Sequence, residues 1–295
     1  AVALSGAMDL MEREGVRVTR GNTANGGGKR YKAKMIGGVF AHRVSRPVDD
    51  GAPDPHLHQH VVLANYGLGP DGELTALDQP EMFAWMMAVG ETHNAIVRQE
   101  LSRRLGVAWT PVDDRGIAQV VGIDERLLER FSRRRQQLLT AVEELGLDPE
   151  DDAHRDSGKY ATRQRKEGWS TRELLDEWRV AAAALGIKVE DLAAELREVW
   201  AVEQERQAAE LDMRAVEEDS LLPGTVEYVI RTLEQHESYF TRQQVIIQCA
   251  RTLEHWGVEW NEIDWSKIEA LADEVLASDE IVTVGEDEMP LPDGQ

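Results

Sequence analysis

The sequence predicts an α+β fold, with an antiparallel sheet in the first half followed by a mostly helical C-terminal region. Two runs rich in β-branched and apolar residues, 35–44 and 57–66, are separated by a polar, proline-containing segment, the pattern of neighbouring strands. A helical signal extends from Pro80 to Leu105, and helical spacing of apolar side chains dominates the chain beyond residue 168.

The first predicted element is a helix over residues 2–15, where apolar side chains recur at helical spacing. Residues 20–30 are basic and contain three consecutive glycines, which favours a flexible loop or a hairpin. The two predicted strands, 35–44 and 57–66, follow. The polar segment between them, 47–55, is expected to be an exposed loop.

A long helix is predicted from Pro80 to Leu105, because proline suits the first helical turn and Gly106 follows the last helical residue. After this helix, short β-type segments are expected at 107–111 and 117–121. Residues 80–121 are therefore expected to form one long helix followed by two short extended segments.

The rest of the chain is predicted to be helical, with one loop-rich bridge at 148–166. One helix is expected to follow an N-cap at Asp124 and to end at Gly146. Ser170 and Glu173 form the sequence pattern of a capping box at the start of another. The remaining predicted elements are helices from 170 to 186 and at 189–217, 225–236, 241–256 and 264–277, and a strand at 281–284.

The formal net charge of −22 is unevenly distributed along the chain. Residues 1–140 carry 18 Lys and Arg against 17 Asp and Glu, whereas residues 141–295 carry 15 against 38. The first 46 residues hold nine basic groups and three acidic ones. Because fields are screened beyond about 10 Å at 0.1 M salt, a basic surface can coexist with an acidic C-terminal half. The charge therefore allows a nucleic-acid partner for the first half and argues against one for the second.

A single cysteine, Cys249, rules out a disulfide framework and a cysteine-based zinc site. Such cysteine usage is typical of a reducing compartment, so we expect a cytoplasmic protein. No run of about 18 apolar residues occurs, so no membrane segment is predicted. The first residues lack the pattern of a secretory leader and do not begin with Met, so we expect the chain to start inside a longer protein.

The histidines are concentrated in one region, because four of the eight histidines in the chain lie within residues 42–60, at His42, His56, His58 and His60. On a strand, alternate residues point to one face, so the last three would share a face, and pairing of the two strands would bring His42 alongside. Three neutral imidazoles around an open position are a common arrangement of catalytic metal sites. Spacing alone does not fix which three would bind. The alternative interpretation is a polar strand whose histidines are coincidental or trap a metal without function.

Residues 40–46, FAHRVSR, and 54–66, DPHLHQHVVLANY, resemble the metal motif of the MobF-type (TrwC-like) conjugative relaxases, members of the HUH endonuclease superfamily. Their pattern is Phe-x-His-x-x-Ser-Arg, then Asp-Pro-x-Leu-His-x-His. The resemblance continues at 120–138, 161–167 and 236–250. The loop before Asp54 is longer than is usual in the family, which a surface loop tolerates. The resemblance implies an antiparallel relaxase palm of the HUH type that is truncated at its N-terminus.

The resemblance implies that His42, His58 and His60 bind a divalent metal ion, and it places His56, usually Gln in the family, outside this group. Mg²⁺, Mn²⁺ and Zn²⁺ are all chemically tolerable there. The implied reaction is nicking of one DNA strand at a transfer origin, with the metal polarising the scissile phosphate and a tyrosine becoming attached to the 5′ end. Asp54 is expected either to support a ligand imidazole through a hydrogen bond or to form a turn before proline.

The nucleophilic tyrosine of the family lies on a strand well upstream of the histidine motif. None of the five tyrosines, Tyr31, Tyr66, Tyr160, Tyr228 and Tyr239, occupies that position. We therefore expect the nucleophile upstream of Ala1, and we expect this fragment to be inactive alone. No Walker A motif is present, so the helicase ATPase of relaxase-helicases is not expected in these residues.

Single-stranded DNA at a transfer origin is the expected partner, together with other conjugation proteins. Candidate phosphate contacts are Arg43, Arg46, Lys32 and Lys34, all within the basic first 46 residues. Three consecutive arginines at 133–135 cannot all face one phosphate track on a helix, so a solvated helix face is their first interpretation and a DNA contact the second.

We expect three parts: a relaxase-like metal-binding domain over 1–150, a helical extension over 151–220, and a small helical module over 221–295 with a winged-helix-like order of elements. The leading function is a metal-dependent relaxase domain that acts through a phosphotyrosine intermediate. One alternative is a non-catalytic DNA-binding or accessory fragment of a relaxase-helicase. The other is an unrelated three-histidine metallohydrolase.

Overall fold

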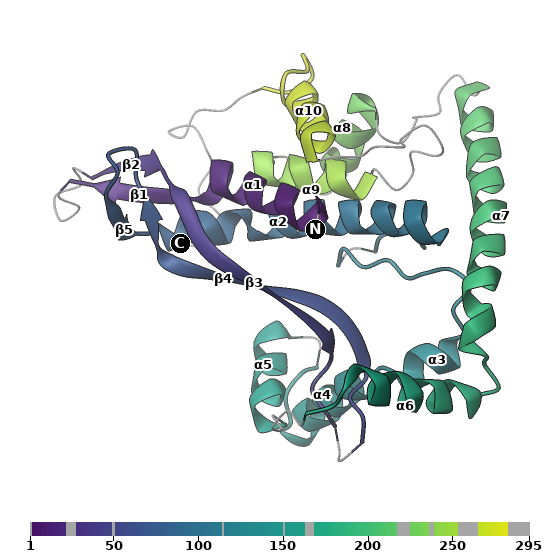
Figure 1. Cartoon of the computed structure of the whole chain (residues 1–295). Helices are drawn as coiled ribbons and strands as arrows, with labels where there is room; N and C mark the ends of the chain where they lie inside the picture. The colour runs from purple at the N-terminus through teal and green to yellow at the C-terminus, as the bar shows by residue number, and fades with distance from the viewer. Residues whose placement is uncertain are drawn as a thin grey trace. The chain divides into compact units, whose positions relative to one another are not determined.

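The α+β class predicted from the sequence is the class of the structure, a computed structural model with antiparallel sheets among helices (Figure 1). The structure describes residues 2–21, 28–48, 51–113, 115–149, 151–162, 168–216, 225–235, 239–252 and 265–282. Internal contacts divide the chain into two compact units. Unit 1 comprises Ala1–Met35, Asn65–Gln119 and Trp200–Gln295, and unit 2 comprises Ile36–Ala64 and Val120–Val199.

Unit 1 has a helical core built from segments far apart in the sequence. Its helices are α1 (Val2–Leu10), the π-helical turn η1 (Met11–Gly15), α2 (Gln79–Leu105), α8 (Val226–Glu234), α9 (Arg242–Thr252) and α10 (Trp265–Leu276). α2 packs against α1 and α9, and α10 contacts α1, α8 and α9 (Figure 1). The buried residues Leu10, Ile246 and Ile268 belong to one hydrophobic cluster that joins these helices. Cys249 lies in the same cluster, and burial raises the pKa of its thiol.

The long helix predicted from Pro80 to Leu105 is confirmed as α2. Proline lies in its first turn, and Gly106 ends it in the left-handed conformation, with φ of 66° and its N–H donated to the Ser102 carbonyl at 2.8 Å. The β-type segments predicted at 107–111 and 117–121 are not regular strands. They still pair over a short stretch, because the Thr110 N–H donates to the Gln119 carbonyl at 2.8 Å. The Asp113 carboxylate accepts from the backbone N–H groups of Arg115 and Ile117 and so forms the turn between them.

The basic stretch after the first helix forms an antiparallel pair, β1 (Arg17–Arg20) with β2 (Lys29–Lys32), in which Arg17 lies opposite Lys32 and Arg20 opposite Lys29. Of the two predicted alternatives, a flexible loop or a hairpin, the paired strands support the hairpin. The glycine-rich connection 22–27 lies outside the described residues. All four residues of β2 are exposed. Val18 of β1 is fully buried and anchors the pair in the core of unit 1.

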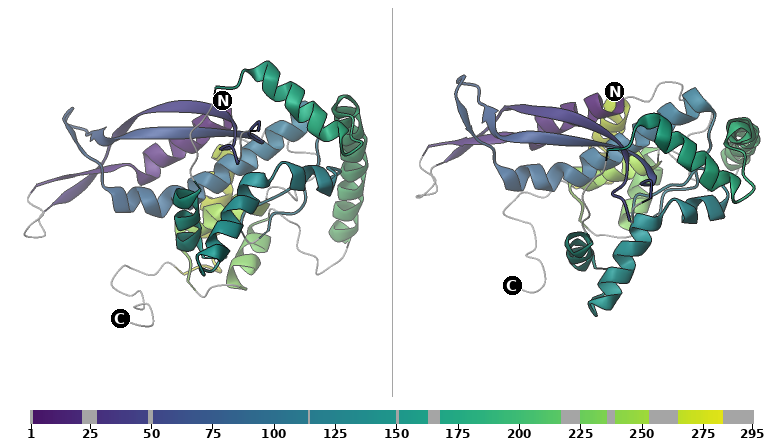
Figure 2. Two further views of the ribbon diagram at one scale, coloured as in Figure 1. Left: turned by 90° about the horizontal axis from the view of Figure 1, so that it is seen from below. Right: turned by 60° about the horizontal axis from the view of Figure 1, so that its bottom comes forward.

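The histidine-bearing sequence forms two long strands, β3 (Lys34–Val44) and β4 (Pro55–Leu68), which are neighbours in a sheet of order β3-β4-β5. Figure 2 shows the two strands side by side. The short β5 (Leu74–Ala76) pairs antiparallel with the end of β4, from Tyr66 to Leu68. The strand predictions are confirmed, and each strand extends beyond its predicted limits.

Unit 2 combines the central parts of β3 and β4 with helices from later in the chain. These are α3 (Glu125–Arg130), α4 (Arg133–Glu144), α5 (Asp152–Ala161), α6 (Thr171–Ala183) and the first turns of α7 (Val189–Val216). The predicted N-cap at Asp124 and the capping box of Ser170 and Glu173 are both present. Among the described helices, none combines the length and the apolar composition needed to cross a bilayer.

Two helix predictions in unit 2 are wrong. The single helix expected from Asp124 to Gly146 is interrupted at Phe131 and Ser132, because the backbone N–H of Arg133 is donated to Asp54 and starts a new helix. The loop expected at 148–166 contains α5. This helix packs closely on α4, since a Cβ on Gly158 would lie 2.8 Å from Val142 Cγ2, and this tertiary contact stabilises a polar sequence as helix.

In the last part of the described chain, residues 281 and 282 are not in a strand, whereas the sequence predicted one at 281–284. Residues 283–295 lie outside the described residues. The helices expected at 225–236, 241–256 and 264–277 are confirmed as α8, α9 and α10, and the predicted positions 236, 253–256 and 264 lie outside the described residues. Their apolar faces contribute to the hydrophobic cluster of unit 1 rather than to a separate core.

Candidate metal centre

Strand geometry places three imidazoles together on one face of the β3–β4 pair. His58 and His60 alternate with Leu57 and Gln59 on β4, so both point to the same side, and His42 reaches them from β3. The ring centroid of His42 is 5.2 Å from that of His58 and 4.5 Å from that of His60, and the last two are 5.0 Å apart. One potential ligand nitrogen from each ring lies within 4.8 Å of the other two.

This donor set fits a divalent ion. Imidazole nitrogens bind Zn²⁺ at about 2.0–2.1 Å, so two nitrogens on one ion are at most about 4.2 Å apart, a spacing that small side-chain rotations reach from the observed geometry. His42 and His58 are half-buried and His60 is exposed. An ion held by the three rings would therefore have an open side for a substrate oxygen.

A backbone carbonyl orients the His58 ring. Its Nδ1 lies 2.8 Å from the carbonyl oxygen of His56, and because a carbonyl only accepts, Nδ1 must carry the proton. The lone pair of this imidazole is then on Nε2, the nitrogen left to bind a metal. The hydrogen bond fixes both the tautomer and the direction of the ring.

His56 lies next to this group without joining it. Its ring stacks on His58 with centroids 4.3 Å apart and an interplanar angle of 27°, an arrangement in which neighbouring rings do not point at a common centre. Desolvation, and then the neighbouring His58, lower the pKa of His56. The structure thus groups His42, His58 and His60 and leaves His56 beside them.

Asp54 is buried, with 2% of its surface exposed, and it binds Arg133. Its Oδ1 accepts from Arg133 Nε at 2.8 Å, and its Oδ2 accepts from the backbone N–H of Arg133 at 3.0 Å. The carboxylate therefore caps the N-terminus of α4 and forms an ion pair at the same time. One expectation for Asp54 is that it accepts a hydrogen bond from a ligand imidazole. In the structure both carboxylate oxygens accept from Arg133 instead.

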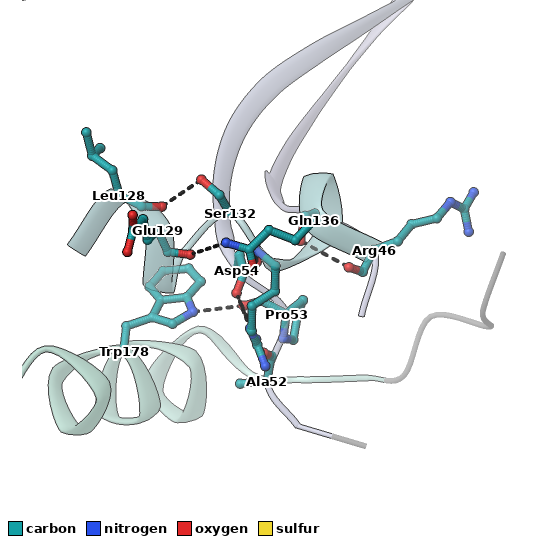
Figure 3. Close-up of polar contacts among 11 residues, drawn as sticks. Arg46, Ala52, Pro53, Asp54, Leu128, Glu129, Ser132, Gln136 and Trp178 are labelled. Atoms are coloured by element: carbon teal, nitrogen blue, oxygen red, sulfur yellow. Dashed lines mark hydrogen bonds and ion pairs between the residues drawn. The ribbon is translucent and has the colours of Figure 1, made fainter. Parts of the chain in front are cut away.

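The two residues before Asp54 are held in the same way. Arg133 Nη2 donates to the Ala52 carbonyl at 2.5 Å, and Trp178 Nε1 on α6 donates to the Pro53 carbonyl at 2.8 Å (Figure 3). Three consecutive residues are thus fixed to two helices immediately before β4 begins at Pro55. These contacts determine where the histidine-bearing strand enters the sheet.

The predicted DNA-binding cations lie in different surroundings. Arg43 is exposed and donates to Thr171 Oγ1 at 3.0 Å. Lys32 is exposed on β2, and Lys34 forms an ion pair with Glu12 at 2.9 Å, which raises the pKa of the lysine. The guanidinium of Arg46 points away from the contacts around Asp54 in Figure 3.

The sequence does not indicate the roles of two residues. For Arg133 it predicts a solvated helix face first and a DNA contact second, because nothing local indicates that Asp54 is its partner. Phe40 lies two residues before His42 on β3, so strand alternation alone places it on the face of the three candidate ligands. This signal was present in the sequence.

Two kinds of comparison with known proteins, with a family model and with solved structures, agree on one family. The sequence model of the TrwC relaxase family matches residues 1–185. A comparison with curated protein sequences gives no match.

Several solved structures are similar to this chain. A conjugative relaxase TrwC in complex with OriT DNA, a metal-free structure, is 26% identical over 63% of this chain and 62% of that chain, with a TM-score of 0.55. TrwC complexed with a 27-mer DNA comprising the recognition hairpin and the cleavage site gives the same identity and TM-score, with coverage of 63% and 64%. A copper-bound TrwC–OriT complex is also 26% identical, covering 63% and 61%, with a TM-score of 0.54. The match thus spans less than two thirds of the length of each solved chain.

Proposed function

Because this chain belongs to the TrwC relaxase family, we propose that it is a metal-dependent conjugative relaxase domain that binds single-stranded DNA at a transfer origin. The observation that carries the proposal is the convergence of His42, His58 and His60 on one open sheet face. A divalent ion bound there, Mg²⁺, Mn²⁺ or Zn²⁺, would stabilise negative charge on the non-bridging oxygens of the scissile phosphate.

The contribution of the protein is to orient the ligands and to leave a side open for the phosphate. Neutral imidazoles do not reduce the charge of an ion as carboxylates would. The bond from His58 to the His56 carbonyl holds one ring in its metal-binding tautomer. The anchoring of Ala52, Pro53 and Asp54 supports the strand that carries two of the three rings.

The proposed phosphate contacts are Arg43, Arg46, Lys32 and Lys34. Arg43 is supported by its exposure and by a neutral hydrogen-bond partner, Thr171, which leaves its charge available. Arg46 is supported by the electrostatics of its surroundings, because burial and then the Arg46 charge lower the pKa of Arg134, and a positive field of this kind attracts phosphate. Lys34 must exchange Glu12 for phosphate, so we expect it to contribute least.

The proposal is tested by measuring the binding of a fluorescent oligothymidylate to the chain with Mn²⁺ and after chelation. We expect binding to be at least about 10-fold tighter with the ion, because a hydrogen bond or contact to a charged group contributes about 1.5–3 kcal/mol. The difference should vanish in His58→Ala, and binding should weaken steeply with salt. Equal affinities with and without the ion in the unsubstituted chain would contradict the proposal.

A further part of the proposal is that none of the five tyrosines in these residues is the nucleophile. Tyr160 is 76% exposed on α5, and Tyr66 follows His60 by six residues, about 20 Å along an extended strand. We expect no covalent protein–DNA adduct when the chain is incubated with Mn²⁺ and a labelled single-stranded oligonucleotide carrying the transfer origin. An adduct mapped by mass spectrometry to any tyrosine of the chain would overturn this part.

The same assay separates the two candidate functions. Cleavage or strand joining by the chain when a tyrosine-bearing N-terminal segment of the family is added supports the relaxase domain. Metal-dependent DNA binding that never leads to cleavage under those conditions favours the non-catalytic accessory fragment. Binding of other conjugation proteins to this chain stays a prediction.

A further inference from the structure

A stripe of exposed, uncharged side chains continues from the three histidines along the same face of the β3–β4 pair. Phe40 is two residues before His42 on β3, and Val62 is two residues after His60 on β4. Phe40 is 56% exposed, Val62 57%, and Ile36, further along β3, 50%. All of these residues belong to unit 2, the unit that contains the histidines.

Strand alternation and the ring distances place these residues together. Residues two apart on a strand lie on one face, which puts Phe40 with His42, and Val62 with His60. The centroid distance of 4.5 Å between His42 and His60 shows that the two sets share that face. Leu57, the most exposed apolar residue on β4, alternates to the opposite face.

The Phe40 ring leans over a residue that has no side chain. Its Cε2 and Cζ lie 3.5 Å and 3.7 Å from the place that a Cβ on Gly38 would occupy. The ring is thus supported from below by backbone, while more than half of the residue remains in contact with solvent. The exposed aromatic ring therefore presents a flat apolar surface beside the candidate metal site, and such a surface suits a planar ligand.

We propose that Phe40 is a stacking platform for a base of the DNA strand whose phosphate is held at His42, His58 and His60. This inference rests on the proposed function. Residues two apart on a strand are separated by about 6.5–7 Å, so a base attached next to the bound phosphate reaches the ring.

The chemistry of the stripe favours a base over other parts of the strand. Ile36, Gly38, Phe40, Val62 and Ala64 carry no charge and no side-chain hydrogen-bond donor, so their side chains cannot bind phosphate or read base edges. They can contact the π-face that every base has. Phe40 therefore contributes to affinity and to the position of the strand at the metal, with little preference for sequence.

The test uses two fluorescent oligonucleotides of about 16 nucleotides, the upper end of typical binding-site sizes: oligothymidylate and an abasic strand with the same phosphates. Phe40→Ala is expected to weaken oligothymidylate binding by about 5- to 150-fold, the equivalent of 1–3 kcal/mol per stacked base, and to leave binding of the abasic strand unchanged. Phe40→Trp should restore oligothymidylate binding, and Phe40→Leu should not.

Two matched variants control for the loss of apolar surface. Leu57→Ala removes an 81% exposed side chain from the opposite face of β4, and Phe83→Ala removes a 65% exposed aromatic ring from α2. Neither should change the affinity for oligothymidylate. The Mn²⁺ affinity of Phe40→Ala should equal that of the unsubstituted chain, which shows that the metal site and the fold are intact.

The inference is overturned if Phe40→Ala binds oligothymidylate normally, if it loses affinity for the abasic strand to the same extent, or if leucine restores binding as well as tryptophan. It is also overturned if Phe40→Ala changes only the oligomeric state, measured by light scattering, because the face is then a protein contact. If Phe40→Ala binds oligothymidylate normally and the unsubstituted chain binds it in a metal-dependent way, the stacking inference fails but the proposed function does not. Metal-independent binding by the unsubstituted chain contradicts the proposed function itself.

Discussion

Replacing His58 with alanine is expected to lower the affinity of the chain for a divalent ion by more than about 100-fold, because loss of a mere outer-sphere partner already costs about 10- to 100-fold. His58 supplies one of three nitrogens that lie within 4.8 Å of one another. Isothermal titration of chelator-treated protein with Zn²⁺ or Mn²⁺ measures the change. The unsubstituted chain should bind one ion per chain, and His42→Ala and His60→Ala should show losses of similar size.

His56→Ala is the matched control, because it removes an imidazole from the same face of the same strand, stacked on His58 at 4.3 Å. Its metal affinity should remain within a few-fold of that of the unsubstituted chain. A loss in His56→Ala as large as in His58→Ala would contradict the assigned triad and make His56 a ligand. A second readout is thermal: an ion at 100 times its dissociation constant stabilises the folded state by about 2.7 kcal/mol, and His58→Ala should lose this shift.

Asp54→Ala is expected to lower the free energy of unfolding of unit 2 by about 3–5 kcal/mol, the cost of leaving one partner of a buried ion pair without the other. The substitution also removes the cap from the first N–H of α4. Unit 2 has few fully buried apolar side chains, Val142 and Ala182 among those described, so one buried pair carries a large share of its stability. Urea unfolding and hydrogen exchange at the α4 amides measure the loss.

Arg133→Ala should destabilise by a similar amount, and the double variant should lose much less than the sum, because both substitutions remove the same interaction. Arg126→Ala is the matched control: its pair with Asp124, at 2.6 Å, is exposed and local, so the unfolding midpoint should hardly change. At a temperature where Asp54→Ala remains folded, its Mn²⁺ affinity should stay near normal. A large loss of metal affinity in the folded variant would instead support a direct role of Asp54 at the metal.

The elements that the sequence predicted correctly are those with local physical causes. Pro80 and Gly106 limit α2 through backbone conformation, and Ser170 with Glu173 begins α6 through its own hydrogen bonds. The failures arose where a distant group intervened. The N-terminus of α4 depends on Asp54, almost eighty residues away in sequence, and α5 depends on close packing against α4 at Gly158.

The candidate site follows the same division. Strand alternation has a period of two, so the sequence by itself determined that His58 and His60 share a face. The family resemblance implied that His42 joins them and that His56 does not, but the distances between the three rings and the stacking of His56 on His58 depend on the pairing of β3 with β4 in the tertiary structure. The tertiary structure also decided the partner of Asp54, since Arg133 reaches it only when residues 36–64 and 120–199 form one compact unit. Local patterns act through neighbouring residues, whereas ligand convergence and buried charge pairing need segments that only the folded chain brings together.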